Sequence, residues 1–90
     1  MSSFLCVSVW MALPLRLEIV GKEMYIGSRA HQVHLRRYDR ELFVGKRINV
    51  RFDGKVAIVY VKKYDSTVTL ECKKIISSMR IGYDKKADSL

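Results

Sequence analysis

The sequence has few of the residues that interrupt or cross-link a chain. One proline and five glycines in 90 residues exclude a collagen-like chain or a proline-rich linker. The two cysteines, Cys6 and Cys72, form no Cys-x-x-Cys pair, which argues against a metal site built from them. A single disulfide stays open, but reduced thiols in a cytosolic protein are the simpler interpretation. The sequence also lacks a glycine-rich phosphate-binding loop.

Charged residues are absent from the first 15 positions. A secretory signal needs basic residues before its apolar core, and none precedes Phe4. The run is also shorter than the roughly 20 residues that span a bilayer, so it is not expected to cross a membrane. Alternation around Val7 and Val9 fits a half-buried strand. Residues 1–13 are therefore predicted to be mobile, covered by a protein partner or a second copy, or an edge strand.

The length and the polar residues argue against catalysis. Ninety residues form one small domain, too short for a large α/β enzyme with its own cleft. No Ser/His/Asp or Cys/His/Asp order points to a nucleophile. His31 and His34 lack a third ligand, and residues three apart on a strand point to opposite faces. We expect no enzymatic activity, no metal and no cofactor.

Short alternating segments fill the middle of the chain. Leu15–Val20 alternates apolar and charged residues, and Gly21-Lys22 joins it to Glu23–Ile26 as a hairpin. His31–Arg37 also alternates, which favours a strand over a helix capped by Ser28. These patterns predict an antiparallel sheet.

The clearest hairpin signal is Asp53-Gly54, which separates Lys46–Phe52 from Lys55–Val61. Asp-Gly favours a two-residue type I′ turn, because both central residues of that turn need positive φ. Such a loop pairs Val50 with Ala57. The second strand is apolar on both faces, as in a small closed or strongly curled sheet.

Two further elements complete the prediction. Thr67–Cys72 is a strand with Val68, Leu70 and Cys72 inward, and Lys73–Arg80 has the spacing of a short amphipathic helix. The fold predicted is mainly β: one small barrel over residues 14–82, SH3-like or OB-like, with a short C-terminal helix. Residues 83–90 are expected to be a solvated tail.

The formal charge is +8, and it is concentrated in the centre of the chain. Between Arg29 and Lys63, ten basic residues face three acidic ones, a net +7. Such a field attracts polyanions, nucleic acid first and an acidic membrane surface second, and we expect nucleic acid rather than a membrane as the partner. Interleaved aromatic side chains can stack on unpaired bases. The candidate nucleic-acid-binding residues are Arg36, Arg37, Arg40, Lys46, Arg47, Arg51, Lys55, Tyr60, Lys62 and Lys63.

A family resemblance begins at Leu42. Leu42–Asp53 followed by Val56–Val61 resembles the C-terminal β-barrel of Mu-type DDE transposases and retroviral-like integrases. The matching positions are Gly45, Lys46, Val50, Arg51, Phe52 and Asp53. The resemblance covers roughly residues 24 to 72, and it implies a non-catalytic barrel that contacts transposon-end or target DNA during recombination. It favours DNA over RNA as the partner and a cytoplasmic, nucleoid-associated location. The catalytic carboxylates would belong to a separate domain.

Two other functions stay open. An RNA- or single-strand-binding barrel would stack bases on Phe52, Tyr60 and Tyr64. A protein-interaction or structural module would instead recruit a protein, or self-associate, through residues 1–13 or an exposed strand edge, and would have no nucleic-acid role.

Overall fold

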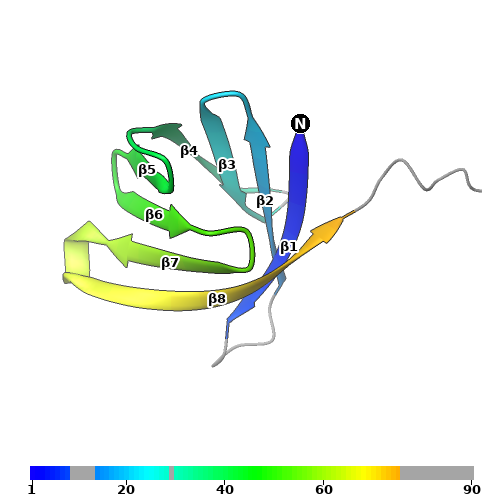
Figure 1. The fold of residues 1–90 in the computed structure, drawn as a ribbon. Coiled ribbons are helices and arrows are strands. Elements are labelled where there is room, and N and C mark those ends of the chain that lie inside the picture. Colours follow the sequence, from blue (N-terminus) through cyan, green and yellow to red (C-terminus); the bar gives the residue numbers. More distant parts are fainter. Residues whose placement is uncertain (9–13, 29, 76–90) are drawn as a thin grey trace, which may run out of the picture.

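The computed structural model describes residues 1–8, 14–28 and 30–75, which form a closed antiparallel barrel of eight strands (Figure 1). The strands are β1 (Ser2–Ser8), β2 (Pro14–Val20), β3 (Glu23–Gly27), β4 (Gln32–Arg37), β5 (Leu42–Gly45), β6 (Ile48–Phe52), β7 (Val56–Val61) and β8 (Ser66–Ile75), and the 3-10 turn η1 (Lys62–Tyr64) joins β7 to β8. Each strand pairs with its neighbours in sequence, and β8 returns to pair with β1. The mainly β barrel is confirmed. Its eight sequential strands correct the OB-like alternative, since an OB barrel has five strands in Greek-key order.

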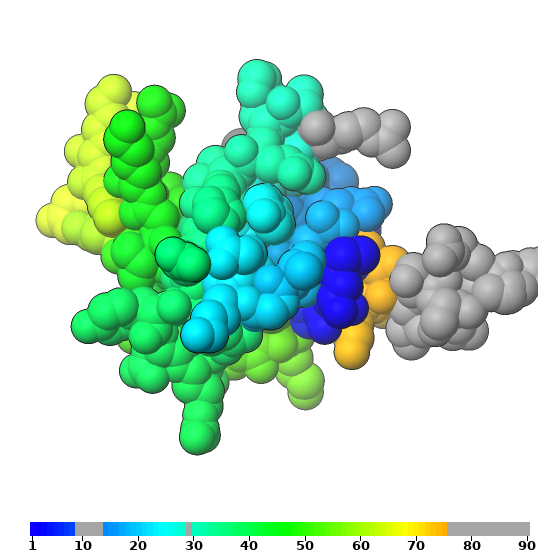
Figure 2. Space-filling view, turned by 90° about the horizontal axis from the view of Figure 1, so that it is seen from above, coloured from blue at the N-terminus to red at the C-terminus, as the bar shows by residue number. Residues whose placement is uncertain are grey.

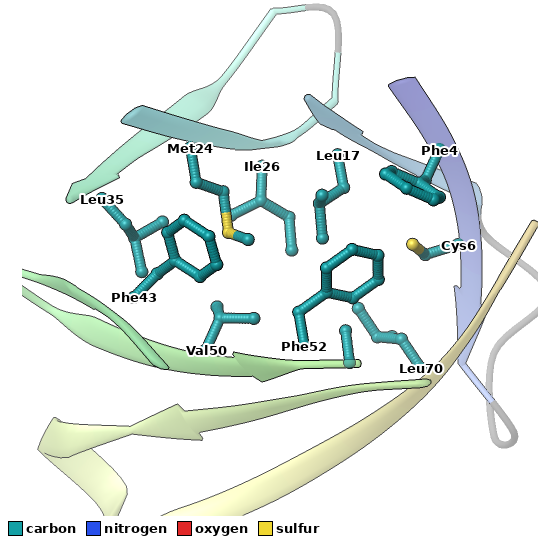
Figure 3. Close-up of a cluster of buried hydrophobic side chains, with 11 residues drawn as sticks. Phe4, Cys6, Leu17, Met24, Ile26, Leu35, Phe43, Val50, Phe52 and Leu70 are labelled. Atoms are coloured by element: carbon teal, nitrogen blue, oxygen red, sulfur yellow. The ribbon is translucent and has the colours of Figure 1, made fainter. Parts of the chain in front are cut away.

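The side chains at alternate positions along each strand point inward and fill the barrel. On β2, for example, Leu17 is buried while Arg16 is exposed to solvent. The buried apolar residues, shown in Figure 3, are Phe4, Cys6, Leu17, Met24, Ile26, Leu35, Phe43, Val50, Phe52, Ala57 and Leu70. Alternation along the sequence therefore located the core face correctly on most strands.

The first strand is part of the barrel. Leu5 pairs with Arg16 of β2 on one side and with Lys73 of β8 on the other, so β1 is not an edge strand. The ring of Phe4 meets that of Phe52 edge to face, with centroids 4.7 Å apart. The barrel thus begins near Ser2 rather than at residue 14, and residues 9–13 lie outside the described part of the chain.

Cys6 and Cys72 form a disulfide, which corrects the expectation of reduced thiols. The two residues face each other in the β1–β8 pairing, with their Cα atoms 4.0 Å apart. They are 66 residues apart in sequence. Their spacing could not reveal the bond, because it depends on closure of the barrel between its first and last strands.

The hairpin around Asp53-Gly54 is present, but its register differs from the prediction by two residues. Val50 pairs with Val59 instead of Ala57. Asp65 is the one described non-glycine residue with positive φ, so Asp53 does not form a type I′ turn. Its carboxylate instead accepts hydrogen bonds from the backbone N–H groups of Lys55 and Val56, at 2.9 and 2.8 Å. A register shift of two residues leaves the same side chains facing inward, so the core face of this hairpin is as predicted.

The C-terminal part differs more. Lys73–Ile75 continue β8 as a strand, so the helix predicted for 73–80 does not begin at Lys73, and residues 76–90 lie outside the described part of the chain. Val68, expected inward, is 37% exposed. By contrast β4 is a strand, as the alternation of His31–Arg37 predicted in preference to a helix.

Within residues 1–8, 14–28 and 30–75, no helix is long and apolar enough to span a membrane.

Gly27 permits the tight connection between β3 and β4. Its φ is +147°, and a Cβ there would lie 2.1 Å from the carbonyl oxygen of His31. Gly27→Ala should therefore lower the free energy of unfolding by about 3 kcal/mol, measured by urea denaturation. Gly21→Ala is the matched control: φ is +62° in open space, so the cost should be nearer about 1 kcal/mol. Equal losses in the two variants would contradict the steric argument.

Candidate nucleic-acid interface

The turns of the barrel are divided between its two ends, because consecutive strands run in opposite directions. The β3–β4, β5–β6 and β7–β8 connections share one end, and the β2–β3, β4–β5 and β6–β7 connections share the other. In Figure 1 the β5–β6 and β7–β8 turns both lie at the left of the barrel, and the β6–β7 turn lies opposite. The candidate cations are consequently distributed over two ends and the outer wall.

One end gathers four of these candidates. Lys46 and Arg47 form the β5–β6 turn, and Lys62 and Lys63 begin η1, which Tyr64 completes. We call these five residues the cationic end. The Lys62 backbone N–H donates to the Arg47 carbonyl at 3.1 Å, and Lys62 Nζ donates to the Gly45 carbonyl at 2.7 Å. Figure 2 shows the two turns side by side, in green and yellow. Pairing of Ile48 with Val61 thus joins two basic pairs that are 16 residues apart in sequence.

These residues surround an open depression of about 700 Å³. Its lining combines the cationic end with three apolar side chains, from Val33, Ile48 and Val61. The Tyr64 side chain is 70% exposed, and Lys63 Nζ lies 5.6 Å from the centre of its ring. The depression therefore offers positive charge, an exposed aromatic ring and apolar surface together.

The four cations of this end form no ion pair with a described carboxylate. Among the described residues, no carboxylate lies within ion-pair distance of Lys46, Arg47, Lys62 or Lys63. Asp65 follows Tyr64 directly, but its carboxylate accepts a hydrogen bond from the Tyr60 hydroxyl at 2.7 Å. This bond and the nearby negative charge raise the pKa of Tyr60. Tyr60, a candidate contact from the sequence, thus hydrogen-bonds the carboxylate that follows Tyr64, and that carboxylate keeps its negative charge.

The opposite end mixes both signs of charge. The candidates here are Arg37, at the end of β4, and Arg40 and Lys55, in the β4–β5 and β6–β7 connections. The same connections carry the carboxylates Asp39, Glu41 and Asp53, and the β2–β3 connection adds Lys22. The Arg37 guanidinium lies 4.6 Å from the centre of the Phe43 ring and donates a 2.5 Å hydrogen bond to the Arg40 carbonyl. Arg37 is therefore engaged within the protein, and this end has little excess charge.

The remaining two candidates lie on the outer wall. Arg36 Nε is 3.3 Å from a Glu23 carboxylate oxygen, while His34 hydrogen-bonds the other oxygen of Glu23 and stacks on Tyr25. Arg51 lies between Leu42 of β5 and Ile58 of β7. The structure therefore brings four of the ten candidates together, with Tyr60 beside them through its bond to Asp65, and separates the other five from them.

Two wall and turn carboxylates should make stability depend on pH. The hydrogen bond with His34, and then the charge of Arg36, hold the pKa of Glu23 below 4.5 against the opposing effect of burial. Backbone N–H groups of Val56 and Lys55 lower the pKa of Asp53 below 3.8. A carboxylate whose pKa is lower in the folded chain than in the unfolded chain stabilises the fold at any pH above its unfolded-state pKa. This stabilisation is lost as the pH falls through its folded-state pKa.

Urea unfolding between about pH 6 and pH 2 measures this contribution. Stability should fall on the acid side of 4.5, and Glu23→Gln should flatten part of that fall. Glu41→Gln, a charge-matched control on an exposed carboxylate, should leave the slope in place. An identical pH profile for the wild type and Glu23→Gln would contradict the role of the Glu23 contacts.

Sequence patterns could not identify the depression. Val33, Ile48 and Val61 look like ordinary strand residues, and Tyr64 was considered for stacking only in an alternative hypothesis. Their convergence depends on the β6–β7 register and on closure of the barrel. No local signal carries that information.

The described residues contain no group of three or more His, Cys, Asp or Glu side chains that could hold a metal ion. The chemistry available at the cationic end is therefore that of ammonium, guanidinium and phenol groups. Comparison of the chain with protein-family models, with curated proteins and with solved structures found no match.

Proposed function

We propose that this chain is a non-catalytic nucleic-acid-binding barrel whose cationic end contacts the phosphate backbone. The observation that supports the proposal most strongly is the grouping of four cations around one depression without a described carboxylate in ion-pair distance. Ammonium and guanidinium groups neutralise phosphates and release the counterions condensed on a nucleic acid. Such contacts position a polymer without reading its bases, so we expect little sequence discrimination.

The sequence resemblance supports DNA as the polymer and recombination as the setting. Of its matching positions, Gly45 and Lys46 lie at or beside the cationic end, whereas Arg51 is on the wall and Phe52 is in the core. We therefore propose a DNA-contacting barrel of transposase or integrase type, as the resemblance implies. We assign the contact to the turns rather than to the matching strand.

A salt titration tests the proposal. Fluorescence anisotropy would follow binding of the chain to duplex DNA, single-stranded DNA and RNA of one sequence. With four phosphate contacts, the logarithm of the association constant should fall against the logarithm of salt with a slope of about −3 to −4. Absence of binding to all three at about 50 mM salt, or a flat response, would overturn the proposal.

The cellular compartment is part of the proposal. A DNA-binding role implies a cytoplasmic, nucleoid-associated protein. The Cys6–Cys72 bond favours an oxidising compartment instead, because cytosolic reductants keep most thiols reduced. Acid quenching of intact cells followed by maleimide labelling of the denatured chain separates the two placements. A cytoplasmic chain would carry two labelled thiols and an oxidised chain none, and denaturation is needed because Cys6 is buried in the fold.

Protein recruitment is the second candidate function. The closed barrel leaves no free edge among its described strands, so strand addition at β1 is not available. The outward side chains of Leu5 and Val7 are 44% and 37% exposed and line a depression with Ile75. They support a side-chain-mediated contact. Sedimentation velocity tests self-association, and a concentration-independent monomer would count against a second copy as the partner.

A further inference from the structure

We infer that the cationic end binds a single-stranded nucleic acid and that an unpaired base stacks on Tyr64; this inference rests on the proposed function. It is carried by the position of an exposed aromatic ring beside the same depression as four cations that form no ion pair with a described carboxylate. Phosphate binding alone would need only the cations. The ring and the apolar lining call for a ligand that also has a flat, uncharged face.

The exposure of Tyr64 is fixed by the turn that carries it. The Lys62 N–H donates to Arg47, and the Asp65 N–H donates to the Lys62 carbonyl at 3.3 Å. Asp65 adopts left-handed backbone angles, and its carboxylate accepts the hydrogen bond from Tyr60. A closed, hydrogen-bonded turn therefore carries the ring, so less conformational entropy is lost from the turn when a ligand binds.

The other two aromatic candidates are less exposed than Tyr64. Phe52 is 6% exposed and packs against Phe4 inside the barrel. Tyr60 lies on the wall with its hydroxyl bound to Asp65. Of the three rings in the single-strand hypothesis, Tyr64 is the one that lines the depression.

The chemistry of the depression distinguishes single strands from duplexes. In B-form DNA the base faces are stacked on each other, and a protein reaches only the base edges in the grooves. An unpaired base exposes a π-face, and stacking on an aromatic side chain contributes about 1–3 kcal/mol per base. A volume of about 700 Å³ falls within the usual range for small-ligand sites, so one or two nucleotides fit. Val33, Ile48 and Val61 would contact the base, while the cations contact its flanking phosphates.

The test compares three probes: a single-stranded oligonucleotide, the duplex of the same sequence, and an abasic strand with the same phosphodiester backbone. Wild-type protein should bind the single strand most tightly. Tyr64→Ala should weaken single-strand binding by about 5- to 150-fold and change duplex and abasic binding little. Tyr64→Phe should retain the wild-type affinity, because the ring remains.

Tyr38→Ala is the matched control. Tyr38 is 78% exposed, but it lies in the β4–β5 connection at the opposite end, so its removal should leave single-strand affinity unchanged. Equal loss in Tyr38→Ala and Tyr64→Ala, or equal wild-type affinity for abasic and normal strands, would overturn the inference and leave the proposed function intact. Absence of binding to all three probes would overturn both. Unchanged thermal unfolding would show that Tyr64→Ala is folded.

Discussion

Reduction of the Cys6–Cys72 disulfide should lower the free energy of unfolding by about 4 kcal/mol. The bond closes a loop with a sequence separation of 66, which strongly restricts the unfolded chain. It also ties β1 to β8, the pairing that closes the barrel between its first and last strands. A loss of this size is a large share of the 5–15 kcal/mol typical of a whole domain.

Thermal unfolding with and without a dithiol reductant measures the effect, and we expect the midpoint to fall by roughly 15–30 °C. Cys6→Ala/Cys72→Ala is the control. Its unfolding midpoint should be close to that of the reduced wild type and should not change when the reductant is added. A difference below about 1 kcal/mol would mean that hydrogen bonds and packing alone hold β1 against β8.

Neutralising the cationic end should have the largest effect on binding. The variant Lys46→Gln/Arg47→Gln/Lys62→Gln/Lys63→Gln removes the four cations that surround the depression. Affinity for single-stranded DNA should fall roughly 100-fold or more at low salt, and the salt slope should lose about three units. Fluorescence anisotropy across salt concentrations measures both quantities.

The control variant changes the same number of charges elsewhere. Lys22, Arg40, Lys55 and Lys74 are exposed and none of them lines the depression beside Tyr64. Replacing all four by Gln should lower affinity only through long-range attraction, which salt near 0.15 M screens over about 8 Å. If this variant loses as much affinity as the first one, net charge controls binding and the cationic end has no special role.

The strands themselves follow from local patterns. Leu15–Val20, Gly21-Lys22 and Glu23–Ile26 form the expected hairpin, because alternation and a glycine turn act over a few residues. The β6–β7 register was wrong by two residues, since the Asp53 carboxylate binds two backbone N–H groups that the dipeptide pattern does not reveal. Local patterns thus established the elements better than their pairing.

Features that depend on barrel closure could not be predicted. Closure pairs β1 on both sides and brings Cys6 to Cys72. The candidate site was affected in the same way: the net charge of the central segment indicated a basic face, but a barrel sends alternate turns to opposite ends. Arg36 and Arg37 are partnered by Glu23 and Phe43, whereas the cations of the two basic turns form no ion pair within residues 1–8, 14–28 and 30–75.

The most direct measurement is an NMR titration of the uniformly ¹⁵N-labelled chain with a short single-stranded oligonucleotide. We expect saturable shifts of the backbone amides in residues 45–48 and 61–65, which form the two turns of the cationic end. Amides of the β4–β5 and β6–β7 connections should shift little. Shifts concentrated in residues 38–41 and 53–55, or no shifts at all, would contradict the assignment of nucleic-acid binding to the cationic end.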